Sequence, residues 1–175
     1  MTDTARQQII NSVKNFNLPK YDEIPNVGLY LEQTAKYISE YCSPFFKNAI
    51  TGSMISNYVK KGLVTNPVKK QYNREQIGYL IFITVAKSVI SMEDIGLLIK
   101  LQQRTYETKV AYDYFSSELK NVLGYVFGIK ETIDDIGNDC SQEKVLLRNT
   151  IITVAHKLYL EKSFEAMQKT EEEDS

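Results

Sequence analysis

The sequence predicts an all-α fold that carries one small β-hairpin. Apolar residues recur three or four positions apart along most of the 175 residues, which is the spacing of one helix face. All four prolines fall between these runs, and only residues 63–72 are typical of a hairpin. Hydrophobic residues make up 43% and charged residues 25% of the chain, so the composition is that of an ordinary folded protein.

Two helices are expected before residue 45. The first spans residues 3–16, is capped by Asp3 and places Ile9, Ile10, Val13 and Phe16 on one stripe. Residues 17–28 contain two prolines and are expected to form a loop. The second helix spans residues 29–42 and places Leu31, Ala35, Ile38 and Cys42 on one face. Pro44 ends this helix or lies just beyond its end.

The middle of the chain predicts three short helices and a turn. The first helix spans residues 52–61, and Gly62 is suited to its C-terminal cap. Residues 63–72 follow, with Val64, Val68 and Tyr72 flanking the turn signal Asn66-Pro67. Asn73 then begins a helix with Gln76 in capping-box position and Ile77, Leu80, Ile81 and Val85 as its stripe. Ser91 begins the next helix, with Asp94 three residues later and Ile95, Leu98 and Ile99 facing the core.

The C-terminal part is expected to be helical from Tyr106 to Ile136, with a stripe of Val122, Val126, Ile129, Ile133 and Ile136. Gly124 and Gly128 interrupt this stripe and indicate close packing or a local break. Residues 137–139 form a turn, and Ser141 caps a last helix that reaches about Met167, with Val145, Ile152, Ala155 and Tyr159 inside.

We divide the chain into an N-terminal helix and linker (1–28), a central domain (29–104), a helical region (105–168) and an acidic tail (169–175). Two arrangements of residues 106–136 stay open. They can pair with a second copy as an antiparallel dimer, or fold back on residues 142–167.

Charge is distributed unevenly. The net charge is −1, but residues 51–74 hold five basic residues and no acidic one, which leaves −6 on the rest of the chain. A basic patch on an acidic body can bind phosphate locally, and a solvated lysine-rich turn is the alternative.

Several classes of function are not expected. No apolar run is long enough to span a bilayer, and the first residues lack a secretory signal pattern, so a cytoplasmic protein is expected. Cys42 and Cys140 lack metal-site spacing, so we expect neither a metal nor another cofactor. The single histidine, His156, lies mid-helix, and Asp134 and Asp135 point apart on a helix, so we expect no enzymatic activity.

The helix at residues 52–61 has two distinct faces. Ile55, Tyr58 and Val59 form an apolar face, while Ser53, Ser56, Asn57, Lys60 and Lys61 fall on the opposite side. Short polar side chains near the N-terminus of a helix can approach base edges, and lysines farther along can reach phosphates. An ordinary amphipathic helix with a solvated face is the alternative.

The order of the motifs resembles the DNA-binding headpiece of the MerR regulators. Tyr58, Lys60, Gly62 and Leu63 match its Tyr-x-Lys-x-Gly-Leu sequence; Tyr72, Asn73 and Ile77 match the helix start after its wing; Ser91, Glu93, Asp94 and Ile95 match its next helix. The similarity covers about residues 29–100. The whole chain also resembles a bacterial family known only as domain of unknown function 1836.

The resemblance to the MerR regulators implies a winged helix-turn-helix, centred on residues 51–74, in a dimeric transcription regulator that binds double-stranded DNA. The implied DNA contacts are Ser53, Ser56, Asn57, Tyr58, Lys60, Lys61, Lys69, Lys70, Tyr72 and Arg74. Tyr58 can be a core residue or a phosphate contact. The chain departs from the MerR regulators at Ser56 and Asn57, where those proteins usually have an arginine and an aromatic residue. The DNA sequence preference of the MerR regulators therefore does not transfer to this chain. A protein-interaction module that keeps the winged-helix shape is the alternative.

A small-molecule effector is conceivable for the C-terminal region. Tyr106, Tyr112, Tyr114, Tyr125 and Tyr159 can line a pocket, but a buried ring with a wet hydroxyl is the more frequent role of tyrosine.

Overall fold

The computed structural model describes residues 3–47, 50–137 and 140–173. Within these ranges it is mainly helical, as the sequence predicts. The helices are α1 (Asp3–Val13), α2 (Leu31–Cys42), α3 (Gly52–Lys60), α4 (Arg74–Ala86), α5 (Met92–Thr105), α6 (Thr108–Val126) and α7 (Gln142–Glu173), with one 3₁₀ turn, η1 (Tyr21–Glu23). Strands β1 (Leu29–Tyr30) and β2 (Gln71–Tyr72) pair antiparallel, with Leu29 opposite Tyr72.

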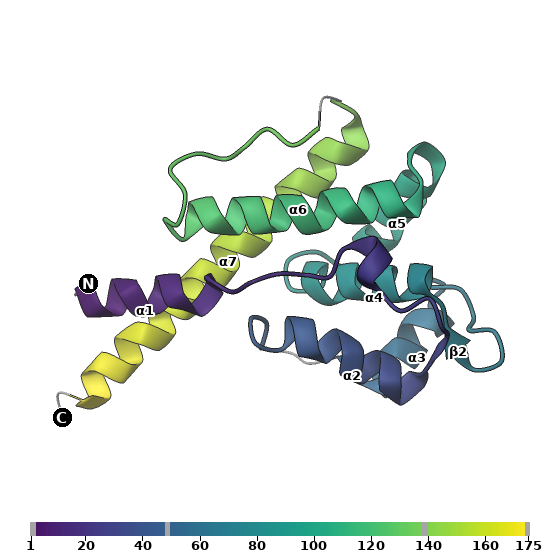
Figure 1. Cartoon of the computed structure of the whole chain (residues 1–175), viewed down its shortest axis with the longest axis horizontal. Coiled ribbons are helices and arrows are strands. Elements are labelled where there is room, and N and C mark those ends of the chain that lie inside the picture. The colour runs from purple at the N-terminus through teal and green to yellow at the C-terminus, as the bar shows by residue number, and fades with distance from the viewer. Residues whose placement is uncertain (1–2, 48–49, 138–139, 174–175) are drawn as a thin grey trace.

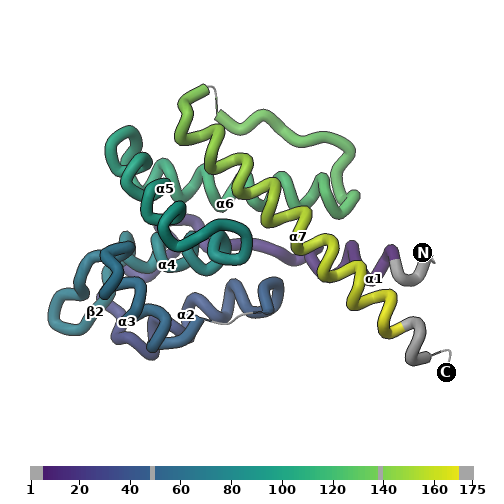
Figure 2. The backbone as a smooth tube through the Cα atoms, turned by 180° about the vertical axis from the view of Figure 1, so that it is seen from behind, coloured from purple at the N-terminus to yellow at the C-terminus, as the bar shows by residue number. Residues whose placement is uncertain are grey.

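The helices pack around α4, which lies between α2 on one side and α6 on the other (Figure 1). Helix α7 crosses α6 and continues to α1, so the two ends of the chain lie at the end of the molecule opposite to α3 and β2 (Figure 2). Ile77, Leu80, Ile81 and Ile83 of α4 are fully buried. Because α4 is enclosed on several sides, its sequence is almost continuously apolar.

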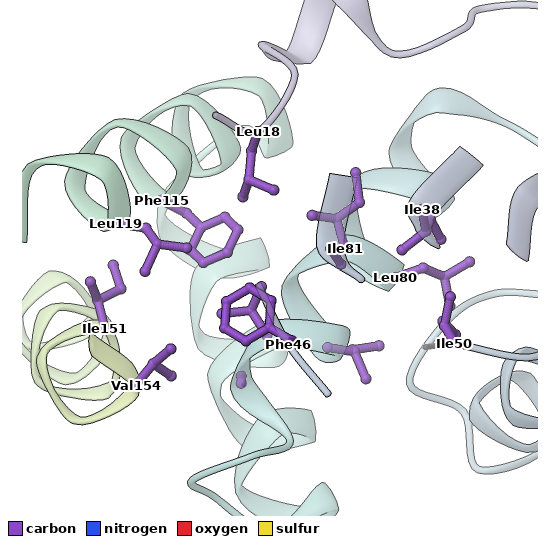
Figure 3. Packing of buried hydrophobic residues seen from close by; sticks show 14 of the residues in the cluster. Leu18, Ile38, Phe46, Ile50, Leu80, Ile81, Phe115, Leu119, Ile151 and Val154 are labelled. Carbon is purple, nitrogen blue, oxygen red and sulfur yellow. The ribbon is translucent and has the colours of Figure 1, made fainter. Parts of the chain in front are cut away.

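One continuous hydrophobic core joins the predicted segments 1–28, 29–104 and 105–168. Figure 3 shows its centre, where Leu18 of the N-terminal linker and Ile81 of α4 lie near Phe115 and Leu119 of α6. Phe46, in the loop after α2, is buried in the same core and stacks edge-on against Phe16. Phe45 packs against the same core, so the loop between α2 and α3 is anchored to the body of the molecule.

Local signals place most helix starts correctly. Asn73 and Gln76 form a reciprocal capping box at α4, with N···O distances of 2.9 and 2.8 Å. Ser91 Oγ accepts a hydrogen bond from the Asp94 backbone at the start of α5, and Ser141 Oγ accepts one from Lys144 at the start of α7. These caps confirm the predicted starts.

The helix predicted over residues 106–136 is too long. Helix α6 ends at Val126, because Gly128 adopts a positive φ of 72° and closes a Schellman motif, in which Ile129 N donates to Gly124 O at 2.8 Å. Ile129 is consequently exposed rather than part of a helical stripe. The next residues fold back across α6, where the side-chain oxygen of Asn121 accepts a hydrogen bond from the Asp134 backbone.

The last helix starts as predicted but differs in its first buried residue and in its end. Val145 is 50% exposed, because the buried face of α7 begins at Thr150 and runs through Ile151, Val154, Ala155 and Leu158. The helix continues to Glu173, past the predicted end at Met167 and into the predicted acidic tail. Asn138 and Asp139 of the predicted turn, and the last two residues, lie outside the described ranges.

Helices α6 and α7 pack against each other within the chain, which is the fold-back arrangement of the two considered. Arg148 Nε of α7 lies 2.9 Å from Glu118 Oε1 of α6, and Glu118 is buried. This ion pair joins the two helices beside their shared apolar contacts. Among the helices of the described ranges, none is both long and apolar enough to cross a membrane.

Candidate nucleic-acid interface

Helix α3 is anchored by one face and exposes the other. Ile55 and Tyr58 are buried in the core, whereas Ser53, Ser56, Asn57 and Lys60 are exposed. The two sets lie on opposite sides because the helical repeat separates positions two apart by about 200°. The helix therefore offers solvent a continuous surface of short polar side chains that ends in lysines.

Helix α2 holds the N-terminal end of α3 in place. Thr51 caps α3 by accepting a hydrogen bond from Met54 N at 3.3 Å. A Cβ at Gly52 would lie 2.5 Å from Glu32 Oε1 and 3.2 Å from Leu31 Cγ, so a larger residue would require these side chains of α2 to shift. The carboxylate of Glu32 thus occupies the positive end of the α3 dipole and adds a negative charge to that edge of the surface.

The C-terminal end of α3 closes in a second Schellman motif. Gly62 has a φ of 73°, and Leu63 N donates to Tyr58 O at 3.0 Å, which confirms the predicted glycine cap. The motif turns the chain so that Leu63 packs on α5, where a Cβ on Gly96 would lie 3.0 Å from Leu63 Cδ2. Lys61 stays exposed at the turn.

Gln76 holds the base of the segment that follows α3. Its side-chain nitrogen donates to the carbonyl oxygens of Thr65 (2.9 Å) and Asn66 (3.2 Å) and to Thr65 Oγ1 (3.1 Å). Its side-chain oxygen caps α4, so one buried amide fastens residues 65–66 to the helix start. Sequence reasoning assigned Gln76 only the capping role.

The hairpin predicted over residues 63–72 is smaller than expected. Val68 and Gln71 form a single antiparallel bridge, and Gln71 N donates to Val68 O at 2.9 Å across a four-residue turn. The partner of β2 is β1, at residues 29–30, and not residues 63–64. Pairing with β1 is non-local, so the local pattern did not reveal it.

Lys69 and Lys70 form the tip of this turn with positive φ values of 50° and 65°. Two positive φ values at the central positions are the pattern of a type I′ turn, for which Asn-Gly is the favoured sequence. A lysine in this region costs about 1 kcal/mol or more relative to glycine. Both side chains are exposed, so the turn presents two cations to solvent at its end.

Three of the residues predicted to contact DNA, Tyr58, Tyr72 and Arg74, are not available to a DNA partner. Tyr58 and Tyr72 are each only 4% exposed, and burial raises the pKa of both phenols. Arg74 is engaged with the N-terminal linker: its Nε donates to Ile24 O at 2.8 Å, one terminal nitrogen lies 3.4 Å from Asp22 Oδ1, and its guanidinium lies over the Tyr21 ring. The other seven predicted residues are all exposed, and we define them as the candidate surface: Ser53, Ser56, Asn57, Lys60, Lys61, Lys69 and Lys70.

The four lysines of this surface have no ion-pair partner among the residues that the structure describes. Lys109, by contrast, is paired with Asp22, and this hydrogen bond holds the pKa of Asp22 below its ordinary value. The surface thus combines unpaired cations with short hydrogen-bonding side chains, a composition suited to a phosphate-bearing partner.

The structure also contains a cavity that the sequence did not place. It lies among α4, α5, α6 and the start of α7, and Tyr106, Tyr112 and Tyr114 are in its wall. Tyr125 is instead exposed. The abundance of tyrosine was the available sequence signal, but the cavity depends on how four helices cross. Within the described ranges, no three His, Cys, Asp or Glu side chains come together as metal ligands would.

The comparisons with known proteins place the chain in a family. The model of the family described as "Domain of unknown function (DUF1836)" matches residues 19–115, from the N-terminal linker to the middle of α6. No curated protein and no solved structure matches the chain. The matched region covers more than half of the sequence and includes the whole polar surface of α3 and the lysine turn. The chain therefore belongs to the DUF1836 family, a family of unknown function.

Proposed function

We propose that this chain is a cytoplasmic bacterial transcription regulator that binds double-stranded DNA in a sequence-specific manner. Helix α3 enters the major groove, and the segment 63–72 acts as a small wing along the backbone. The observation that carries this proposal is the strained pair Lys69 and Lys70 beside the polar face of α3. A turn that keeps two lysines where Asn-Gly would be more stable is explained by a partner that needs their charge.

The residues divide into two roles. Ser53, Ser56 and Asn57 face base edges, where Asn57 can pair with adenine through its amide. Lys60, Lys61, Lys69 and Lys70 bind phosphates on either side of the groove. Tyr58 and Tyr72 are buried in the core, and Arg74 is hydrogen-bonded to the N-terminal linker. None of the three therefore belongs to the proposed DNA contacts.

The order of elements supports a winged helix-turn-helix. Helices α2 and α3 pack together, the lysine turn follows, and α4 and α5 come next, which is the order of the MerR-like headpiece. The connection between α2 and α3 is longer than in a tight helix-turn-helix, and Phe45 and Phe46 pack it onto the body. The proposal of a winged helix rests on this order and on the polar surface.

We further propose a homodimer, in which two copies of α3 read a palindromic site. The apolar face of α6 is already buried within the chain, so it is unavailable for the antiparallel pairing considered above. Helix α7 has an unpartnered stripe on its C-terminal half, formed by Leu160, Phe164 and Met167. This stripe is the surface that supports dimerisation.

The experiment is a pull-down of fragmented genomic DNA from the encoding organism at moderate salt, followed by sequencing. Enrichment of a few sites that share an inverted repeat is the expected result. Recovery of only salt-sensitive random fragments, or of no DNA, would contradict sequence-specific binding.

The alternative is a protein-interaction module with the same shape. It is favoured by apolar groups beside the lysine turn: Val68 is 73% exposed, and its bridge partner Gln71 pairs with the exposed Tyr30. A protein partner would bury these apolar groups at its interface, whereas DNA would leave them largely exposed. Substituting Val68 and Tyr30 by serine would abolish protein capture under this alternative and leave DNA affinity nearly unchanged under the leading proposal.

A further inference from the structure

A cavity of about 360 Å³ lies at the junction between the family-matched region and the C-terminal helices. Phe82 of α4, Leu98 and Ile99 of α5, Ala111 and Phe115 of α6 and Leu147 of α7 contribute apolar groups to its wall. A volume of this size is in the range of small-molecule sites, which start at about 300 Å³. The cavity is therefore large enough for a small aromatic molecule of two or three rings.

The charged side chains of the wall already have partners within the chain. Asp113 Oδ1 accepts from Tyr21 N at 2.9 Å, and Glu143 Oε1 accepts from Thr105 Oγ1 at 3.1 Å. Lys144 Nζ donates to Gly137 O at 2.6 Å. The hydroxyl group of Tyr79, a polar group of the wall, is likewise engaged: it donates a hydrogen bond to Gln102 Oε1 at 3.0 Å. With these charges engaged within the chain, the surface that the wall offers to a ligand is almost entirely apolar, which favours a neutral ligand.

We propose that this cavity is a binding site for a neutral, aromatic or aliphatic small molecule. An apolar ligand bound there would remove its own apolar surface and that of the wall from water, which favours binding. Helices from both parts of the chain form the wall, so a bound molecule contacts the matched region and the C-terminal region together.

The site is connected to the α3 surface through α5. Leu98 and Ile99 line the cavity, and Gly96, on the same helix, packs against Leu63 directly after α3. A ligand that shifts α5 would therefore shift the C-terminal end of α3. This regulatory consequence rests on the proposed DNA binding, but ligand binding itself does not. A ligand changes DNA affinity only as far as it prefers one of the two arrangements of α5.

Two neutral probes test the site in the full chain: N-phenyl-1-naphthylamine, followed by its fluorescence, and indole, used as a competitor. We expect saturable fluorescence enhancement that indole reverses. The cavity-filling variants Leu98→Trp and Ala111→Phe should each weaken naphthylamine binding about tenfold or more. Leu97→Trp is the matched control, because Leu97 is exposed on the same helix and does not line the cavity.

Helical circular dichroism and cooperative melting verify the fold of each variant, and indole competition on the wild type provides a reading that needs no variant. Absence of saturable binding by both probes would overturn the proposal. Equal binding by the wild type and a folded cavity-filling variant would overturn it as well. The assay contains no DNA, so its failure is distinguishable from a failure of DNA binding.

Discussion

Arg74 Nε donates a hydrogen bond of 2.8 Å to the carbonyl oxygen of Ile24, fifty residues earlier in the chain. Arg74 also donates to the backbone oxygen of Asp22, so the first turn of α4 holds the linker between α1 and β1. Ile24 is fully buried at this point. The linker leads directly into β1, and β1 pairs with β2 at the base of the lysine turn. Arg74 thus positions the candidate surface without belonging to it.

Substituting Arg74 by alanine is expected to affect stability rather than DNA contact. Loss of the bonds to Ile24 and Asp22 should lower the free energy of unfolding by about 1.5–3 kcal/mol, the range for hydrogen bonds that involve a charged group. The salt dependence of DNA affinity should stay unchanged. Denaturant unfolding and salt titration measure the two effects. Lys70→Ala is the matched control: it should reduce the salt slope of DNA affinity and leave the free energy of unfolding nearly unchanged. A reduced salt slope in the folded Arg74 variant would show that Arg74 does contact DNA.

Replacing Lys69 and Lys70 by Asn-Gly should stabilise the protein and weaken its DNA binding. Asn-Gly suits the positive φ values of the turn, so we expect a gain of about 1 kcal/mol in the free energy of unfolding. The salt slope of DNA affinity should fall by about 1.8, since each lost phosphate contact contributes about 0.9. The variant Lys69→Gln/Lys70→Gln removes the two charges without changing the turn preference. It should reduce the salt slope of DNA affinity without raising the free energy of unfolding. Unchanged DNA binding in both variants would remove the turn from the interface.

Gln76 is predicted to be the most important side chain for order in the lysine turn. Gln76→Leu removes three bonds to residues 65–66 and the bond from Asn73 N, so it should cost about 1–3 kcal/mol, because these partly buried bonds are lost together. Hydrogen exchange should accelerate in residues 65–72. Gln33→Leu is the control, because Gln33 makes an equivalent capping bond to Tyr30 N on the exposed surface. Similar losses in the two variants would contradict the special role of Gln76.

The two cysteines should differ sharply in reactivity. Burial raises the pKa of Cys42 to about 12, so its thiol stays protonated and inert at pH 8, whereas Cys140 is exposed. Mass spectrometry after brief treatment with iodoacetamide should find one label on the folded chain, at Cys140, and two after denaturation. Because the folded pKa of Cys42 exceeds the unfolded one, this thiol lowers stability as the pH rises above about 8.5. Rapid labelling of Cys42 in the folded chain would contradict its place in the core.

Sequence reasoning located the features that depend on neighbouring residues. The caps at Asn73, Ser91 and Ser141 and the glycine stop at Gly62 follow from local hydrogen bonding, so the structure confirms them. The polar face of α3 follows from helical periodicity alone. Gly128 was noted as an interruption, but the choice between close packing and a stop depends on the bonds that its left-handed conformation permits.

The features that sequence reasoning missed depend on distant parts of the chain. The pairing of β1 with β2 involves two residues on each strand, too few for a periodic pattern. Arg74 was assigned to DNA because it follows a basic turn, and its partners Asp22 and Ile24 lie in a loop with no local signal. Val145 was assigned to the core by spacing, but the buried face of α7 begins at Thr150, more than one turn later.

The most direct test of DNA binding through α3 is the salt dependence of affinity for an enriched DNA site, compared between the wild type and Lys60→Ala/Lys61→Ala. With four lysines on phosphates, log K against log[salt] should have a slope of about −3.6 per subunit in the wild type and about −1.8 in the double variant. Lys14→Ala/Lys169→Ala, which removes two exposed lysines near α1 and at the end of α7, should retain the wild-type slope. A folded Lys60/Lys61 variant with the full wild-type slope would contradict the assignment of α3 as the DNA-reading helix.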